Sequence, residues 1–462
     1  MTSLRDLFGA ATAEVRYRLA PSAETGQSSL WPWPVATGLV AIAAAAVLIR
    51  APDLEGRWAT LAWPGDRESA ATMLQVVAAS VITATTLAFS LVVVALQLAS
   101  QQFSPRLLRR FTRDRPTKAV LSVLVGTFAF AVTVLRSLEG DGGPPSSAMA
   151  VVYGLSLVSL GALVGFIAYV ARALRVDTMM VSVHEEAAAG IEEFYPPAGE
   201  GGDDPPPAPP GAEVVRSSAS GFVQVVDSDN LVEELAPHEL VVRMLVRPGD
   251  HVVTGAPVAL AWSSRASWTG PADPTGTRTA GAAVANNVEV GYERTLAQDP
   301  SFGFRLLADI AVKALSPSVN DPVTAAHSVG HMADLLVRLC GRDLGPRAHR
   351  DDAGVVRLVT VDRDFRYHLD LACGQVRRYG RHEPAVLAAL LQLLRDVACH
   401  ATTDEHRTEV DRQVALIVDS ARDSALEADL ELVRDLVARV ELALAGRLVE
   451  AYADRSGETR ST

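Results

Sequence analysis

Apolar residues gather in four runs in the N-terminal part of the chain, and the stretches between these runs are polar. The second run contains no charged residue, and an arginine-rich segment follows it directly. A helix needs about 20 apolar residues to cross the hydrocarbon core of a bilayer, so such runs predict transmembrane helices. The four predicted spans are Val35–Ile49, Thr72–Ser100, Ala119–Leu135 and Ser147–Val170.

The loop between the second and third spans is strongly basic, and Asp114 is its only acidic residue. The loops before and after this pair of spans hold fewer basic residues. The positive-inside rule places the basic loop in the cytoplasm, and with four spans both termini then lie on that same side. The basic residues of the loop are Arg106, Arg109, Arg110, Arg113, Arg115 and Lys118.

Beyond the fourth span the pattern changes several times. An amphipathic stripe continues past the span and predicts a stalk helix, and the Pro- and Gly-rich stretch after it predicts a spacer. Short β-like runs separated by turns follow, and helical patterns fill the rest. The predicted segments are a cytoplasmic N-terminal arm (1–34), a four-helix transmembrane domain (35–172), an amphipathic stalk helix (173–195), a linker (196–211), a β-rich module (212–285) and a mostly helical cytoplasmic domain (286–462).

The β-rich module contains a distinctive phrase, Val246–Val258, with turns at Pro248-Gly249 and Gly255. It resembles the hammerhead of biotinyl- and lipoyl-type barrel-sandwich modules. The module has no lysine, which excludes a covalently carried biotin or lipoate. We therefore expect a structural or docking module and no cofactor. The predicted fold class is an α+β membrane protein with four transmembrane helices, a small β-rich barrel-sandwich-like module and a helical C-terminal cytoplasmic domain.

Charge and cysteine usage narrow the class of partner. The chain of 462 residues has a formal net charge of −12, and most acidic residues follow the spans. An acidic domain argues against nucleic acid, because phosphate binding needs a basic face. The three cysteines include no CxxC pair, which argues against a zinc site and suits a reducing compartment.

Two phrases point to one family. The first is Phe89–Arg106, which reads FSLVVVALQLASQQFSPR, and the second is Asp309–Ala325, which reads DIAVKALSPSVNDPVTA. Together they resemble a bacterial family of predicted membrane proteins, domain of unknown function 2254, over most of the chain. The resemblance implies four spans, a cytoplasmic C-terminal region and a location in the bacterial cytoplasmic (inner) membrane. It implies no activity.

A polar stripe follows the second span. At 100° per residue, six polar residues fall within an arc of roughly 80°, opposite a face of Val, Leu, Ile and Ala. Such a stripe favours one of two structures. It lines a pathway if several copies of the helix surround an axis, or it packs on neighbouring helices through hydrogen bonds. The six residues are Gln75, Thr83, Thr86, Ser90, Gln97 and Gln101.

The predicted spans contain no Asp, Glu, Lys, Arg or His. Proton relays and ion-coupled transporters usually need such groups, so the sequence favours a passive channel or a non-transporting anchor. The fourth span carries Gly161 and Gly165 as a GxxxG pair, with Gly154 two turns earlier. Small residues let helices approach closely, either within one chain or between copies.

Two local patterns are candidate sites in the C-terminal part. The corner Ser316-Pro317-Ser318-Val319-Asn320-Asp321 precedes a helix that begins at Pro322, with Asp321 as its predicted N-cap. It is either a structural turn or a binding loop in which Ser316, Asn320 and Asp321 meet a ligand or the membrane domain. His327, His331 and Asp334 then share one helix face, which is either an ordinary polar face or part of a metal site.

The sequence contains no nucleophile elbow, P-loop, dinucleotide fingerprint, HExxH or kinase signature. No residue set therefore argues for an enzyme. We expect either an oligomeric channel-like or transport-associated protein, or a membrane-anchored scaffold or signalling module whose cytoplasmic domain binds a partner or small ligand. The expected partners are the lipid bilayer and further copies of the chain.

Overall fold

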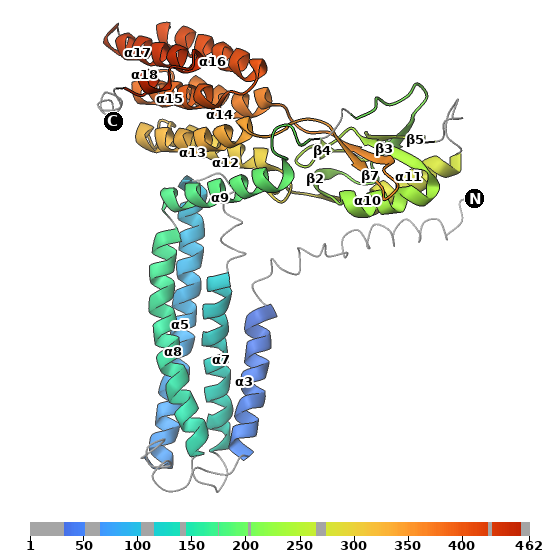
Figure 1. Ribbon diagram of the computed structural model, residues 1–462. Coiled ribbons are helices and arrows are strands. Elements are labelled where there is room, and N and C mark those ends of the chain that lie inside the picture. The colour runs from blue at the N-terminus through green and yellow to red at the C-terminus, as the bar shows by residue number, and fades with distance from the viewer. Residues whose placement is uncertain are drawn as a thin grey trace, which may run out of the picture. The chain divides into compact units, whose positions relative to one another are not determined.

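The computed structural model describes residues 32–50, 65–102, 115–138, 145–173, 175–201, 205–264, 274–423 and 427–453. The chain forms two compact units, Met1–Arg175 and Val176–Thr462. The first unit is built from helices, and the second combines strands with a larger set of helices (Figure 1).

The four predicted transmembrane helices are confirmed, since four helices of the first unit are long and apolar enough to cross a membrane. Helix α5 has 36 residues and is longer than a bilayer core of about 30 Å requires. Helix α5 ends at Gln102. Of the predicted basic loop, Arg115 and Lys118 lie in α7, and the other four basic residues lie outside the described residues. The helices are α3 (Pro32–Arg50), α5 (Arg67–Gln102), α7 (Arg115–Ser137) and α8 (Ser146–Ala173).

Helix α7 is the centre of this bundle, because it packs against α3, α5 and α8, and α5 also packs against α8. Helices α3 and α7 approach closely at Gly126, where an added Cβ would lie 3.1 Å from the Cγ2 of Thr37. Between α7 and α8, the buried hydroxyls of Thr127 and Ser159 lie 2.9 Å apart and share a hydrogen bond. Gly126 of α7 therefore allows the close approach of α3 and α7.

The strands of the second unit form two sheets in the described part of the chain. The larger has the order β1-β5-β3-β8-β7 and the smaller the order β4-β2-β6. The predicted barrel-sandwich-like module needs correction, because the strands do not close into a barrel. Strand β8 adds in parallel to β3 and extends the sheet instead. The strands are β1 (Glu213–Arg216), β2 (Gly221–Val226), β3 (Leu240–Met244), β4 (His251–Val252), β5 (Pro257–Ser263), β6 (Val288–Gly291), β7 (Arg347–Arg350) and β8 (Val356–Thr360).

Two helices that the hydrophobic pattern did not predict, α10 (Ser228–Leu235) and α11 (Pro274–Asn287), pack on these strands. The carboxylate of Asp227 caps α10 by accepting a hydrogen bond from the backbone N–H of Asn230 at 3.1 Å. Leu231 of α10 is fully buried in the core of the sheets. Packing thus stabilises helices whose own sequences are short or rich in Gly, Thr and Asn.

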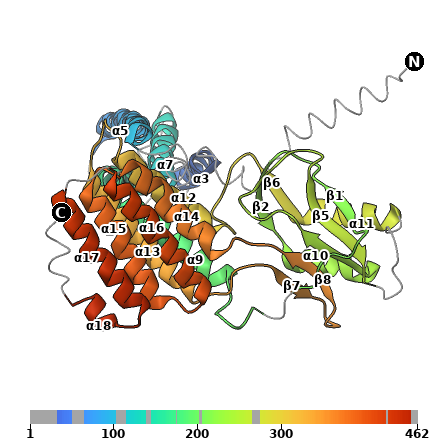
Figure 2. The same ribbon diagram turned by 90° about the horizontal axis from the view of Figure 1, so that it is seen from above.

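The remaining helices form a stack of pairs (Figures 1 and 2). Helix α14 packs on α12 and α16 on α14, while α15 packs on α13 and α17 on α15. Helix α9, within the predicted stalk, packs its buried face against α12 and α13. The helices are α9 (Val176–Phe194), α12 (Pro300–Ala314), α13 (Pro322–Cys340), α14 (Phe365–Tyr379), α15 (Pro384–His400), α16 (Asp404–Arg422), α17 (Glu427–Leu444) and α18 (Leu448–Ala451).

A buried charge network joins the sheets to the helical stack at the turn before β4. Arg363 donates to the carboxylate of Asp250 at 2.9 Å and lies 3.5 Å from that of Asp299. Arg294 donates to Asp299 at 2.5 Å. Gly249 has φ of +88° and lies so close that a side chain there would collide with Asp299. Buried charges are tolerated only when paired, and here each has a partner.

The turn glycines give a matched pair for testing this network. Gly249→Ala is expected to destabilise the protein by roughly 3 kcal/mol, because the methyl group both strains the backbone and displaces the Arg294–Asp299 pair. Gly255→Ala is expected to cost only about 1 kcal/mol, since φ is +85° there but no atom lies within 4 Å of the new Cβ. Thermal unfolding of the full chain in detergent, followed by tryptophan fluorescence, measures both. Equal destabilisation would contradict the role of the network.

Candidate functional site

The polar stripe of α5 faces away from the other helices of its own bundle. Gln75, Thr83, Thr86, Ser90 and Gln97 are all exposed, and the side chain of Gln101 lies outside the described residues. The opposite side of α5 carries the residues that pack on α7 and α8. The buried residues of α5 are Ala70, Leu74, Ala78, Val81, Ala88 and Ala95.

Hydrogen bonding separates the members of the stripe into two kinds. The hydroxyls of Thr83 and Thr86 donate to the backbone carbonyls of Ala79 and Ile82 at 2.8 and 3.0 Å. Such hydroxyls are satisfied by their own helix and tolerate a hydrocarbon environment. A glutamine amide has two donors and an acceptor, and a bilayer core supplies no partner for them.

The stripe is long enough to cross a bilayer. Gln75 and Gln97 are separated by 22 residues, or about 33 Å of helix at 1.5 Å per residue. This length matches a hydrocarbon core of about 30 Å. Along the helix, the hydroxyls of Thr83, Thr86 and Ser90 lie between these two amides.

The glycines of α8 also lie on an exposed face. An added Cβ at Gly154, Gly161 or Gly165 would meet no atom within 4 Å. They therefore do not mediate packing among the described residues. Of the two readings of the GxxxG pair, contact within the described bundle is excluded.

The corner between α12 and α13 is held by its own hydrogen bonds. The carboxylate of Asp321 caps α13, with Oδ1 accepting from the N–H of Thr324 at 3.0 Å and Oδ2 from its hydroxyl at 2.6 Å. These bonds lower the pKa of Asp321. Asn320 is exposed with φ of +49°, and Ser316 is half-buried. Asp321 thus has the predicted capping role, and a ligand role for the three residues stays a prediction.

Asp334 of the predicted histidine face binds α9 rather than its neighbours on α13. Its Oδ2 lies 2.7 Å from the Nε2 of His184 and accepts from Arg338 at 2.8 Å. Burial alone would raise the pKa of Asp334, but these bonds outweigh it and lower the pKa. The His184 and His331 rings lie 5.2 Å apart. Nowhere in the described residues do three His, Cys, Asp or Glu side chains lie in positions to hold a metal ion.

Sequence reasoning missed a fully buried histidine near the charge network. His368 donates from Nδ1 to the carbonyl of Asp364 at 2.9 Å, and its Nε2 is buried without a hydrogen-bond partner. Its ring contacts Phe304 and Tyr195. Burial lowers the pKa of His368 to about 4. Nearby, burial raises the pKa of Asp362, which accepts a hydrogen bond from Tyr195 at 3.2 Å.

Perturbed pKa values often mark active sites, but ion-pair networks perturb them too. Here Arg247 donates to the carbonyl of Asp362 at 2.7 Å, and the neighbouring carboxylates are paired with arginines. The aspartate N-cap of α14, Asp364, fixes the backbone beside His368. This arrangement is typical of a structural junction. A sequence signal existed only in the clustering of Asp362, Arg363 and Asp364.

Comparison with known proteins gives the family. A family model described as predicted membrane protein (DUF2254) matches residues 27–396. The chain belongs to this family. Uncharacterised proteins of Mycobacterium bovis and Mycobacterium tuberculosis are each 34% identical to it over 422 residues, which cover 89% of this chain and 80% of each relative. No solved structure matches the chain significantly. Membership of the DUF2254 family therefore supports a membrane protein without assigning an activity.

The buried histidine predicts a pH dependence of stability. The folded state disfavours protonation of His368, while the unfolded chain binds the proton below a pKa of 6.5. Stability should therefore be full above pH 6.5 and fall by roughly 3 kcal/mol as the pH drops to about 4. His368→Phe should flatten this slope in pH-dependent unfolding of the full chain. His238→Phe, at an exposed histidine, is the control, and a slope unchanged by His368→Phe would contradict the assignment.

Proposed function

We propose that this DUF2254 protein is an oligomeric, channel-like membrane protein in which copies of α5 surround a polar pathway. One observation carries the proposal. The polar stripe of α5 lies opposite the face that packs on the chain's own bundle. Further copies of the chain, packed around a common axis, would turn an outward stripe into an enclosed one.

The chemistry of the stripe favours passive movement. Thr83, Thr86 and Ser90 offer hydroxyls and carry no charge, and no titratable group occurs in the predicted spans. Coupling to a proton or ion gradient usually needs such a group. We therefore propose a water-filled pathway for small polar solutes or ions.

The orientation belongs to the same proposal. The basic loop between α5 and α7 carries Arg106, Arg109 and Arg110, and positive residues are retained on the cytoplasmic side of the bacterial inner membrane. The termini and the second unit would then lie in the cytoplasm. At that mouth the arginines would raise the local concentration of anions.

A membrane-anchored scaffold is the second candidate function, and the stack of helix pairs favours it. Stacked helical pairs present extended surfaces that many proteins use for binding. In this reading the spans only anchor the chain, and the stripe of α5 serves assembly without conduction. The two functions differ in whether the stripe contributes to ion flow.

Substitutions in the middle of the stripe separate them. Thr86→Leu combined with Ser90→Leu should reduce conductance in planar bilayers in KCl to background, because leucines block the pathway without opposing assembly. Ser80→Leu is the matched control, since Ser80 is exposed on the same helix about 100° from the centre of the stripe. Unchanged conductance in the double variant would contradict the channel proposal and favour the scaffold function.

A further inference from the structure

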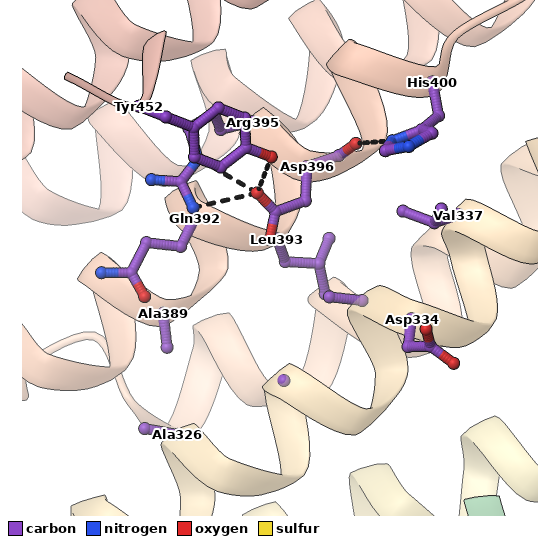
Figure 3. A pocket seen from close by; sticks show the side chains of 12 residues that line it. Ala326, Asp334, Val337, Ala389, Gln392, Leu393, Arg395, Asp396, His400 and Tyr452 are labelled. Carbon is purple, nitrogen blue, oxygen red and sulfur yellow. Dashed lines mark hydrogen bonds and ion pairs between the residues drawn. The ribbon is translucent and has the colours of Figure 1, made fainter. Parts of the chain in front are cut away.

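A hollow of about 500 Å³ opens between α13, α15 and the end of α18 in the helical stack (Figure 3). Pockets of about 300–1,000 Å³ commonly hold small-molecule ligands. The hollow is separate from the α5 stripe and from the charge network, so an inference drawn from it does not rest on the proposed channel.

The hollow exists because small residues replace the side chains that would fill it. Ala326, Gly330 and Ala333 line it from α13, at helical spacings that put them on one face. Ala389 lines it from α15. An added Cβ at Gly330 would meet no atom within 4 Å. The groove between two packed helices is thus open where closely packed interiors are normally filled.

A fixed carboxylate stands at one end of the hollow. Oδ1 of Asp396 accepts from the hydroxyl of Tyr452 at 2.5 Å and from Nη2 of Arg395 at 2.9 Å (Figure 3). The Arg395 guanidinium is 3% exposed and stacks over the Tyr452 ring at 4.2 Å. No described residue donates to the second oxygen of Asp396. The network therefore orients a carboxylate that retains a free acceptor.

Two more acceptors belong to residues that line the same hollow. Nδ1 of His400 lies 2.8 Å from the backbone carbonyl oxygen of Asp396. A carbonyl only accepts, so Nδ1 carries the proton and Nε2 of the neutral ring is an acceptor. Asp334 uses Oδ2 for His184 and Arg338, and no described residue donates to its Oδ1. The amide of Gln392 completes the polar lining.

We propose that this hollow binds a small organic cation, an amine or guanidinium carried on a short aliphatic chain. Its hydrogen-bond donors meet the free oxygens of Asp334 and Asp396 and Nε2 of His400. Its methylene groups pack on the alanine-lined floor around Gly330. An anionic ligand would face the two carboxylates, and Arg395, the arginine that lines the hollow, is buried against Asp396.

Titration of the full-length protein in detergent with agmatine tests the proposal by isothermal calorimetry. Agmatine joins a guanidinium and an ammonium by four methylenes. We expect saturable binding with one site per chain, and no binding of glutarate, an anion of similar length. A tripeptide with a central arginine separates two sources of the same chemistry, because binding of the peptide as well as agmatine indicates a protein side chain as the natural ligand.

Two glycine variants make the test specific. Gly330→Leu places a side chain in the hollow from a position where an added Cβ meets no atom within 4 Å, and should abolish agmatine binding. Gly374→Leu places the same side chain at an open helical position of α14 away from the hollow, and should leave binding unchanged. Asp334→Asn should weaken binding about tenfold through loss of a charged acceptor. Absence of agmatine binding, equal binding of glutarate, or binding that survives Gly330→Leu in a folded protein would overturn the proposal.

Discussion

A bilayer core supplies no hydrogen-bond partner, and this constraint decides how the helices of the first unit are arranged. Inside its bundle the described chain buries mostly apolar residues, and the buried hydroxyls of Thr127 and Ser159 satisfy each other. On the outer side of α5 the hydroxyls of Thr83 and Thr86 donate hydrogen bonds to backbone carbonyls of the same helix. Gln75 and Gln97 are exposed on the same side. In the proposed assembly, other copies of the chain cover this outward polar stripe.

A protein interior likewise supplies few partners for polar groups, and in the second unit the charges of the junction are paired with one another. Where the sheets meet the helical stack, Arg363 and Asp299 are buried and Arg294 and Asp250 are half-buried, and each has an oppositely charged partner. Gly249 is needed there because the backbone itself approaches the ion pair. The junction fixes two structural parts to each other, whereas the hollow between α13 and α15 retains acceptors without donors.

The sequence predicted what depends on local pattern. Hydropathy located the four spans, and Asp321 with Pro322 marked the start of α13 because capping is a local interaction. The 3.6-residue period revealed the stripe of α5, but not which way it faces, since that depends on where α7 and α8 pack. Strands β3 and β8 are neighbours in the sheet but are more than 100 residues apart in the sequence. No local pattern could therefore show that the sheet is open. The hollow depends on small residues of α13 facing Ala389 of α15, and only the fold brings them together.

The proposed pathway requires α5 to contact α5 helices of other copies of the chain. Native mass spectrometry of the full chain in lipid nanodiscs measures the number of copies directly. A closed assembly of three or more chains is the predicted result, because fewer helices cannot enclose a pathway. A monomer would leave the stripe exposed to lipid and would contradict the proposed oligomeric pathway.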